Sequence, residues 1–70
     1  MYYVNYIRTT NDVNGNPRRA FVVYDVQGRH IETIDEGFRG TGELDEKYPN
    51  HVILMTVEVP VKEYKRFLKM

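Results

Sequence analysis

The sequence predicts one small α+β domain, an antiparallel β-meander of about four strands with a C-terminal amphipathic helix packed on the sheet. Three observations predict this fold. Four segments are rich in strand-forming residues, turn residues separate the first three of them, and the C-terminal segment has apolar residues at helical spacing. A chain of 70 residues is long enough for one domain, which we assign to 1–70.

Residues 2–10 are expected to form the first strand, because Tyr, Val, Ile and Thr fit a pleated, half-buried surface. Side chains alternate across a strand, so positions 2, 4 and 6 should share one face and positions 3 and 7 the other. Residues 11–17 contain an Asn-Gly pair and a proline, which predict a hairpin loop.

The second strand is expected over 19–26, with positions 20, 22, 24 and 26 alternating onto one face. Gln27-Gly28 then predicts a tight turn, and residues 29–34 a short third strand. Residues 35–50 are polar and contain glycines and a proline, so we expect a long connection there, with a helical turn over 43–48 compatible with its residues. Connections of this length in a small domain are usually functional or partly ordered.

Val52–Met55 is a continuous apolar run that continues with Val57 and Val59. It predicts either a central strand covered on both faces, or a strand covered on one face and paired through an oligomer. In the C-terminal segment, Val61, Tyr64, Phe67 and Leu68 fall on one stripe of a helix, opposite a stripe of basic residues. The apolar stripe should lie across one face of the sheet.

Composition excludes several classes of chemistry. The chain has no Cys and no Ser, which removes disulfides, thiolate metal sites and the two commonest nucleophiles. His30 and His51 lie in separate segments without zinc-site spacing, so we expect no metal and no cofactor. No catalytic set is assembled, which predicts a protein that is not an enzyme. The chain shows neither a signal peptide nor an apolar run that would span a bilayer, so a cytoplasmic protein without membrane contact is expected.

The leading functional hypothesis is a small protein-binding module. The segment after the third strand is acidic, and its glycine-flanked loop presents an aromatic residue and an arginine, which are favoured at binding hot spots. Such a segment would compete for the basic groove of a nucleic-acid-binding protein. The predicted partner-binding residues are Asp35, Glu36, Phe38, Arg39, Glu43, Asp45 and Glu46.

Two alternatives remain open. One is a nucleic-acid-binding module that combines stacking with phosphate contacts, although the formal net charge of zero offers little attraction. Its residues would be Tyr3, Arg8, Arg18, Arg19, Lys62, Lys65, Arg66 and Lys69. The other is a self-assembling structural subunit, in which a second copy covers the apolar strand, so that the protein is a monomer or a homodimer.

In its compactness, its Tyr-rich first strand and its lack of Cys and Ser, the chain is similar to short accessory proteins of phages and other mobile elements. Some of these, such as the anti-CRISPR proteins, block host defence nucleases. The resemblance is one of size and composition, and it implies an inhibitor of a host nucleic-acid-binding or defence protein.

Overall fold

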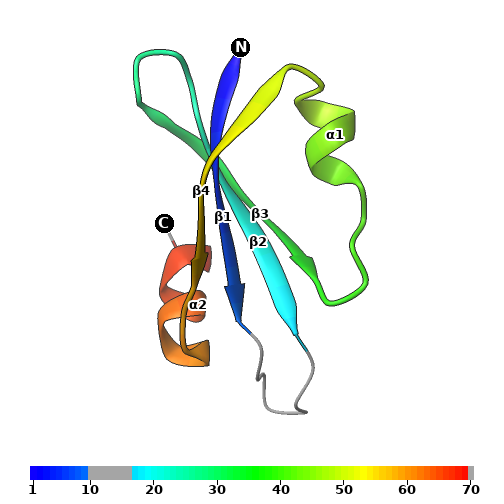
Figure 1. Ribbon diagram of the computed structural model, residues 1–70, viewed down its shortest axis with the longest axis vertical. Coiled ribbons are helices and arrows are strands. Elements are labelled where there is room, and N and C mark those ends of the chain that lie inside the picture. Colours follow the sequence, from blue (N-terminus) through cyan, green and yellow to red (C-terminus); the bar gives the residue numbers. More distant parts are fainter. Residues whose placement is uncertain (10–16, 70) are drawn as a thin grey trace.

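The computed structural model describes residues 1–9 and 17–69, so the hairpin loop expected over 11–17 falls almost entirely outside the described residues. The described residues form, in chain order, β1 (Tyr2–Thr9), β2 (Arg18–Tyr24), β3 (His30–Gly37), α1 (Glu43–Lys47), β4 (His51–Glu58) and α2 (Val61–Leu68) (Figure 1). The prediction of an α+β chain with four strands and a C-terminal helix is confirmed.

The strands form one mixed sheet with the order β3-β2-β1-β4. β1 pairs antiparallel with β2, and β2 pairs antiparallel with β3, but β4 pairs parallel with β1. The prediction of a purely antiparallel meander is therefore wrong. The chain crosses from β3 at one edge of the sheet to β4 at the other, and a crossover of this length is what a parallel pair requires.

The crossover contains a second helix, which corrects the prediction of a single one. The expected helical turn over 43–48 is confirmed as α1, and the first residues of the predicted connection belong to β3 instead. Gly42 precedes the helix with φ of 73° and has no side chain to cap it. Glu36 takes this role, because its Oε1 accepts a long hydrogen bond of 3.5 Å from the backbone N–H of Leu44. This contact is tertiary, so no local pattern indicates it.

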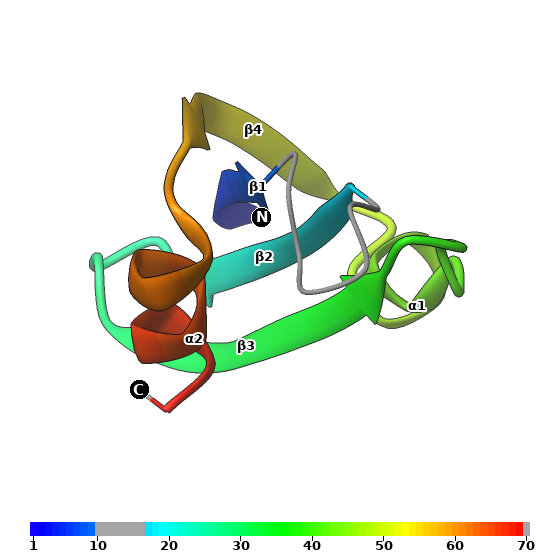
Figure 2. The same cartoon turned by 90° about the horizontal axis from the view of Figure 1, so that it is seen from below.

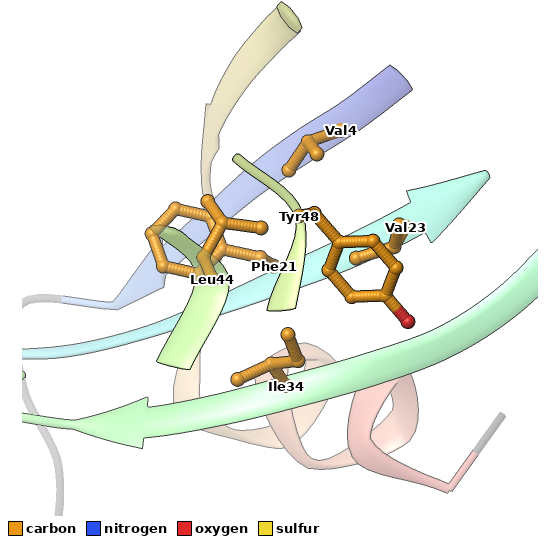
Figure 3. Close-up of a cluster of buried hydrophobic side chains, with 6 residues drawn as sticks. All are labelled: Val4, Phe21, Val23, Ile34, Leu44 and Tyr48. Carbon is orange, nitrogen blue, oxygen red and sulfur yellow. The ribbon is translucent and has the colours of Figure 1, made fainter. Parts of the chain in front are cut away.

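One face of the sheet is covered by the α1 segment. Leu44 and Tyr48 lie over the strands there, as Figure 3 shows. The buried cluster on this face is Val4, Phe21, Val23, Ile34, Leu44 and Tyr48. Edge-on aromatic pairs extend it, with ring centroids 4.7 Å apart for Tyr2–Tyr48 and 5.0 Å apart for Tyr6–Phe21. We call this the α1 face.

The opposite face, the α2 face, is covered by the C-terminal helix. Tyr64 is 1% exposed and packs with Ile7, Ala20 and Val22. Phe67 and Leu68 pack against the same cluster, so the predicted apolar stripe of the helix is confirmed. Because β2 contributes alternate residues to both clusters, it is the buried central strand of the domain.

Two strand boundaries differ from expectation. The alternation pattern places Val26 on a strand face, but β2 ends at Tyr24 and Val26 is exposed in the following turn. Asp25 ends the strand, since its Oδ1 accepts hydrogen bonds from the backbone N–H groups of Gln27 and Arg29. β3 continues beyond the expected end at residue 34 to Gly37.

β4 is an edge strand, so the prediction of a central strand covered on both faces is wrong. It is the outermost strand of the sheet in Figure 2, with no described element beyond it. α1 packs against β3, and α2 packs mainly against β1 and β3. The two helices therefore cover the middle and the opposite edge of the sheet and leave most of β4 uncovered.

Candidate binding surfaces

The fold does not leave all the predicted acidic residues available to a partner, and Asp35 is paired with other residues of the domain. Arg18 Nη2 donates to Asp35 Oδ2 at 2.7 Å, and the Tyr64 hydroxyl donates to Oδ1 at 2.8 Å. The backbone N–H of Gly37 donates to the same Oδ1 at 3.0 Å. With three donors on its carboxylate, Asp35 fastens α2 to the sheet and has little capacity left for a partner.

Glu36 is buried. Its carboxylate lies 3.6 Å from Arg19 Nε and accepts the hydrogen bond that caps α1. A carboxylate with these neighbours serves the structure of the domain, because removing it would leave the Arg19 charge and the backbone N–H of Leu44 without their partner. The first N–H of α1, that of Glu43, donates separately to Thr41 Oγ1 at 3.2 Å. Glu36 therefore offers no accessible charge to a partner, whereas Asp35 is exposed but already paired within the domain.

The rest of the predicted surface is accessible. Asp45 is 85% exposed along its side chain, with its carboxylate 3.8 Å from Nε2 of His51, and Glu46 is exposed. Glu43 is half-buried and lies 3.7 Å from Lys47 Nζ. On the loop before α1, Phe38 is exposed and the Arg39 guanidinium lies 5.6 Å from the centroid of its ring. The structure thus leaves a smaller acidic patch on α1 and an aromatic tip beside it.

A polar clasp fastens α1 to β3. The hydroxyl of Tyr48 donates a hydrogen bond to Glu32, and Lys47 Nζ lies 3.3 Å from the same carboxylate. The hydrogen bond from Tyr48, followed by the one from Lys47, lowers the pKa of Glu32. Burial and the contact with Glu32 raise the pKa of Tyr48 to about 12. Both groups are held in the protonation states that they have at neutral pH, so the clasp is structural.

The structure brings residues of both hypotheses into one hollow of about 210 Å³ at the end of the sheet where β1 stops and β2 starts. It is lined by Tyr6, Arg8, Pro17, Arg18, Arg19, Gly37 and Phe38, and we call it the arginine hollow. Guanidinium groups beside aromatic rings suit phosphates and stacked bases. Arg18 is paired with Asp35 and Arg19 with Glu36, however, so most of the positive charge is already neutralised.

Arg19 is positioned in this hollow by a glycine. Gly40 has φ of 74°, and a Cβ added there would lie 2.0 Å from Arg19 Nη2. The Arg19 Nε is buried and makes no hydrogen bond among the described residues, since Glu36 lies at ion-pair distance only. The positive φ favours glycine at this position, and the guanidinium that an added Cβ would meet is the end of a flexible side chain that would have to move.

The other predicted nucleic-acid contacts lie elsewhere. Tyr3 belongs to the face opposite to that of Tyr6, because neighbouring residues of β1 alternate. Lys62, Lys65, Arg66 and Lys69 are exposed on α2, where Arg66 pairs with Glu63 at 2.9 Å. The structure therefore separates the bases of α2 from Arg8 and Arg19, and the predicted set does not form one continuous surface.

The most exposed apolar surface was not among the predicted site residues. Val52, Ile53, Leu54 and Met55 follow one another on β4 and are between 40% and 62% exposed. Other large exposed apolar residues in the described part of the chain, such as Val26 and Ile31, do not form such a run. The sequence signal was present, because no charged residue stands between His51 and Glu58. We call His51–Glu58 the β4 edge.

Within residues 1–9 and 17–69, no group of three or more His, Cys, Asp or Glu side chains is placed to hold a metal ion. In the same residues, neither helix has the length and apolar character needed to cross a membrane. Comparison with protein-family models, with curated proteins and with solved structures gave no match to this chain.

Proposed function

We propose that the protein is a non-enzymatic protein-binding module that binds its partner by adding a strand to the β4 edge. The observation that carries the proposal is the run of four exposed apolar residues on a sheet edge that no other described strand pairs with. An edge strand offers free backbone N–H and C=O groups, and its side chains supply specificity. A contiguous exposed apolar strip is characteristic of an interaction surface.

The acidic patch on α1 extends this surface. The contact of 3.8 Å between the Asp45 carboxylate and His51 Nε2 places α1 next to the first residue of β4. A partner strand on the β4 edge would therefore meet apolar side chains along its length and carboxylates at one end. In this function the module acts stoichiometrically, as an inhibitor or an adaptor of its partner. One form of this proposal is that the partner is a host defence protein, which the module inhibits.

The test is affinity capture from nuclease-treated cell lysate with three baits: the unchanged chain, Leu54→Lys and Val26→Lys. Both substitutions place a lysine at an exposed apolar position, at residues that are 62% and 63% exposed, but only the first lies on the β4 edge. We expect a defined protein with the unchanged chain and with Val26→Lys, and its loss with Leu54→Lys. Equal capture by all three baits would contradict binding through β4.

A second pair of variants separates the apolar edge from the acidic patch. Asp45→Asn with Glu46→Gln removes two exposed charges without touching Asp35 or Glu36, which stabilise the fold. If the β4 edge carries the binding, this double variant keeps its partner with a reduced salt dependence. Loss of the partner with the double variant alone would move the function to charge mimicry through α1.

The arginine hollow favours a second candidate, the binding of single-stranded nucleic acid. The specific observation is that Arg8, Tyr6 and Phe38 line one cavity, and that Arg8 makes no ion pair within the described residues. Fluorescence anisotropy with a labelled oligonucleotide tests it. Arg8→Ala should abolish binding that Arg66→Ala on α2 preserves, and binding equally weakened by both would contradict a site in the hollow.

A further inference from the structure

We propose that the partner of the β4 edge is a second copy of this chain, joined through β4 in an antiparallel pair about a two-fold axis perpendicular to the sheet. This inference rests on the proposed function and names the occupant of the same surface. It joins two four-stranded sheets into one continuous sheet and leaves the α1 faces of both copies on the same side.

The first argument is that the middle of β4 carries no charged residue and no proline, and that no described strand or helix lies beyond its outer edge. Natural edges are protected from pairing with another chain by charged residues, prolines, β-bulges or a covering element, and of these the middle of β4, within the described residues, has only the extra residue at Leu54. Residues 52–57 of β4 are Val-Ile-Leu-Met-Thr-Val, without a charge or a proline. A domain of this size also buries only about 60% of the surface of its unfolded chain, and a second copy is a common source of additional burial.

The second argument is the register shift within β4. Val4 of β1 lies opposite Ile53, but the next residue, Asn5, lies opposite Met55, so Leu54 is an extra residue in the strand. As a result, His51 and Ile53 share the α1 face with Thr56 and Glu58. Val52, Met55 and Val57 share the α2 face. The extra residue therefore inverts the odd–even alternation at the middle of the strand.

This inversion makes β4 symmetric about its centre. When a regular strand pairs antiparallel with a second copy of itself, residues that lie opposite each other must point to the same face of the sheet. Because faces alternate along a regular strand, the two-fold axis then passes beside one residue, which lies opposite its own copy. In β4 the axis instead falls between Leu54 and Met55, halfway along the element His51–Glu58. Ile53 then lies opposite Thr56 of the other copy on the α1 face, and Val52 lies opposite Val57 of the other copy on the α2 face.

The same register is complementary in polarity and charge. Leu54 lies opposite Met55 of the other copy, so the exposed apolar residues cover one another at the centre. At both ends, the carboxylate of Glu58 lies opposite the imidazole of His51, and no two acids are directly opposite along the strand. The helices do not obstruct the approach, because their main contacts are with β1 and β3.

The absence of cysteine makes a direct test of the register clean. Ile53→Cys and Thr56→Cys both change exposed positions of the α1 face. The Cα atoms of opposite residues in an antiparallel pair are about 4.5–5.5 Å apart, within the range of Cα separations that a disulfide spans. In a dimer of either variant with itself, the two introduced thiols would instead be roughly 10 Å apart along the strands. Mixing the two variants under mild oxidation should therefore give a disulfide-linked heterodimer, whereas each variant alone should stay unlinked.

Analytical ultracentrifugation of the unchanged chain and of Leu54→Lys completes the test. We expect twice the mass of one chain for the unchanged protein at tens of micromolar, a single-chain mass for Leu54→Lys, and twice the mass for the control Val26→Lys. Cross-linking of Ile53→Cys with itself would overturn the register.

The outcomes also separate this inference from the proposed function. A single-chain mass for the unchanged protein overturns the inference. If the unchanged chain has the mass of one chain but captures from lysate a protein that Leu54→Lys does not capture, the β4 edge binds that protein and the proposed function stands. If Leu54→Lys changes neither mass nor capture, both proposals are wrong.

Discussion

Two runs of four apolar residues differ in burial in this molecule: one is buried and the other is exposed. Ala20–Val23 lies on β2 and is at most 6% exposed, whereas Val52–Met55 lies on β4 and is at least 40% exposed. Both runs form strands, and both have the composition of a buried strand. The difference comes from sheet order, because β2 has a strand on each side and a helical segment over each face, while β4 is at the edge. An apolar run thus predicts a strand, but its neighbours decide whether the strand is core or interface.

The largest expected effect is the difference in stability between a lysine placed in the apolar run of β2 and a lysine placed in the apolar run of β4. Val22→Lys places an ammonium group in the α2-face cluster, at a cost of several kcal/mol, comparable with the whole stability of a small domain. We expect it to be unfolded. Leu54→Lys should change the free energy of unfolding of the single chain by no more than about 0.5 kcal/mol. Urea denaturation followed by tyrosine fluorescence at submicromolar concentration measures both, and equal losses would show that β4 is as buried as β2.

Removing the anchor of α2 should have the next largest effect. Tyr64→Ala creates a cavity beneath the helix and should destabilise the domain by about 3–5 kcal/mol. Tyr64→Phe keeps the ring but removes the hydrogen bond to Asp35, which retains Arg18 and the Gly37 N–H, so we expect a loss of about 1 kcal/mol. Thermal melts of both variants give the comparison. If the two losses are equal, the hydrogen bond and not the packing holds α2.

Substitution of two glycines tests whether the loop before α1 packs against Arg19 of β2. Gly40 and Gly28 have φ of 74° and 81°, so an alanine at either position costs about 1–2 kcal/mol of backbone strain. At Gly28 nothing lies within 4 Å of an added Cβ, whereas at Gly40 the Cβ meets the Arg19 guanidinium. Gly40→Ala should therefore cost about 1 kcal/mol more than Gly28→Ala in urea denaturation. Identical costs would show that the Arg19 guanidinium moves aside without loss of stability, and that its contact with the loop does not hold the loop to the sheet.

A further comparison concerns the clasp between α1 and β3 at alkaline pH. The pKa of Tyr48 is raised from 10.0 to about 12, first by burial and then by its contact with Glu32. A raised pKa in the folded state stabilises the fold below the unfolded value, and this contribution is lost as the pH rises from about 10 to 12. The free energy of unfolding should fall over this window, and it should fall less steeply in Tyr48→Phe. The same slope in both proteins would contradict the clasp.

Local patterns were sufficient for much of the fold. Alternation placed Tyr2, Val4 and Tyr6 on one face of the first strand, and the apolar stripe through Tyr64 identified α2 as a helix that packs on the sheet. The helical turn at α1 was also visible, although the hydrogen bond from Leu44 to Glu36 was not, because Glu36 belongs to another element. These features depend on the spacing of neighbouring residues, which a sequence shows directly.

The candidate surfaces depended on contacts between distant residues. Asp35 and Glu36 have the same charge as Asp45 and Glu46 in the sequence, yet the first two form ion pairs with Arg18 and Arg19, and Glu36 is also buried. Asp45 and Glu46 are exposed and make no such pair with an arginine among the described residues. Arg8 and Phe38 came from separate hypotheses and line the same hollow.

By itself, the sequence determined that this is an α+β chain with four strands, a terminal amphipathic helix and no thiol chemistry, since composition and periodicity decide these properties. The tertiary structure decided that β4 runs parallel to β1 at an edge, and therefore that its apolar residues face outward. The physical reason is that backbone hydrogen bonds can extend a sheet on either side with the same residues. Which side the last strand takes depends on the path of the crossover, and not on the strand's own sequence.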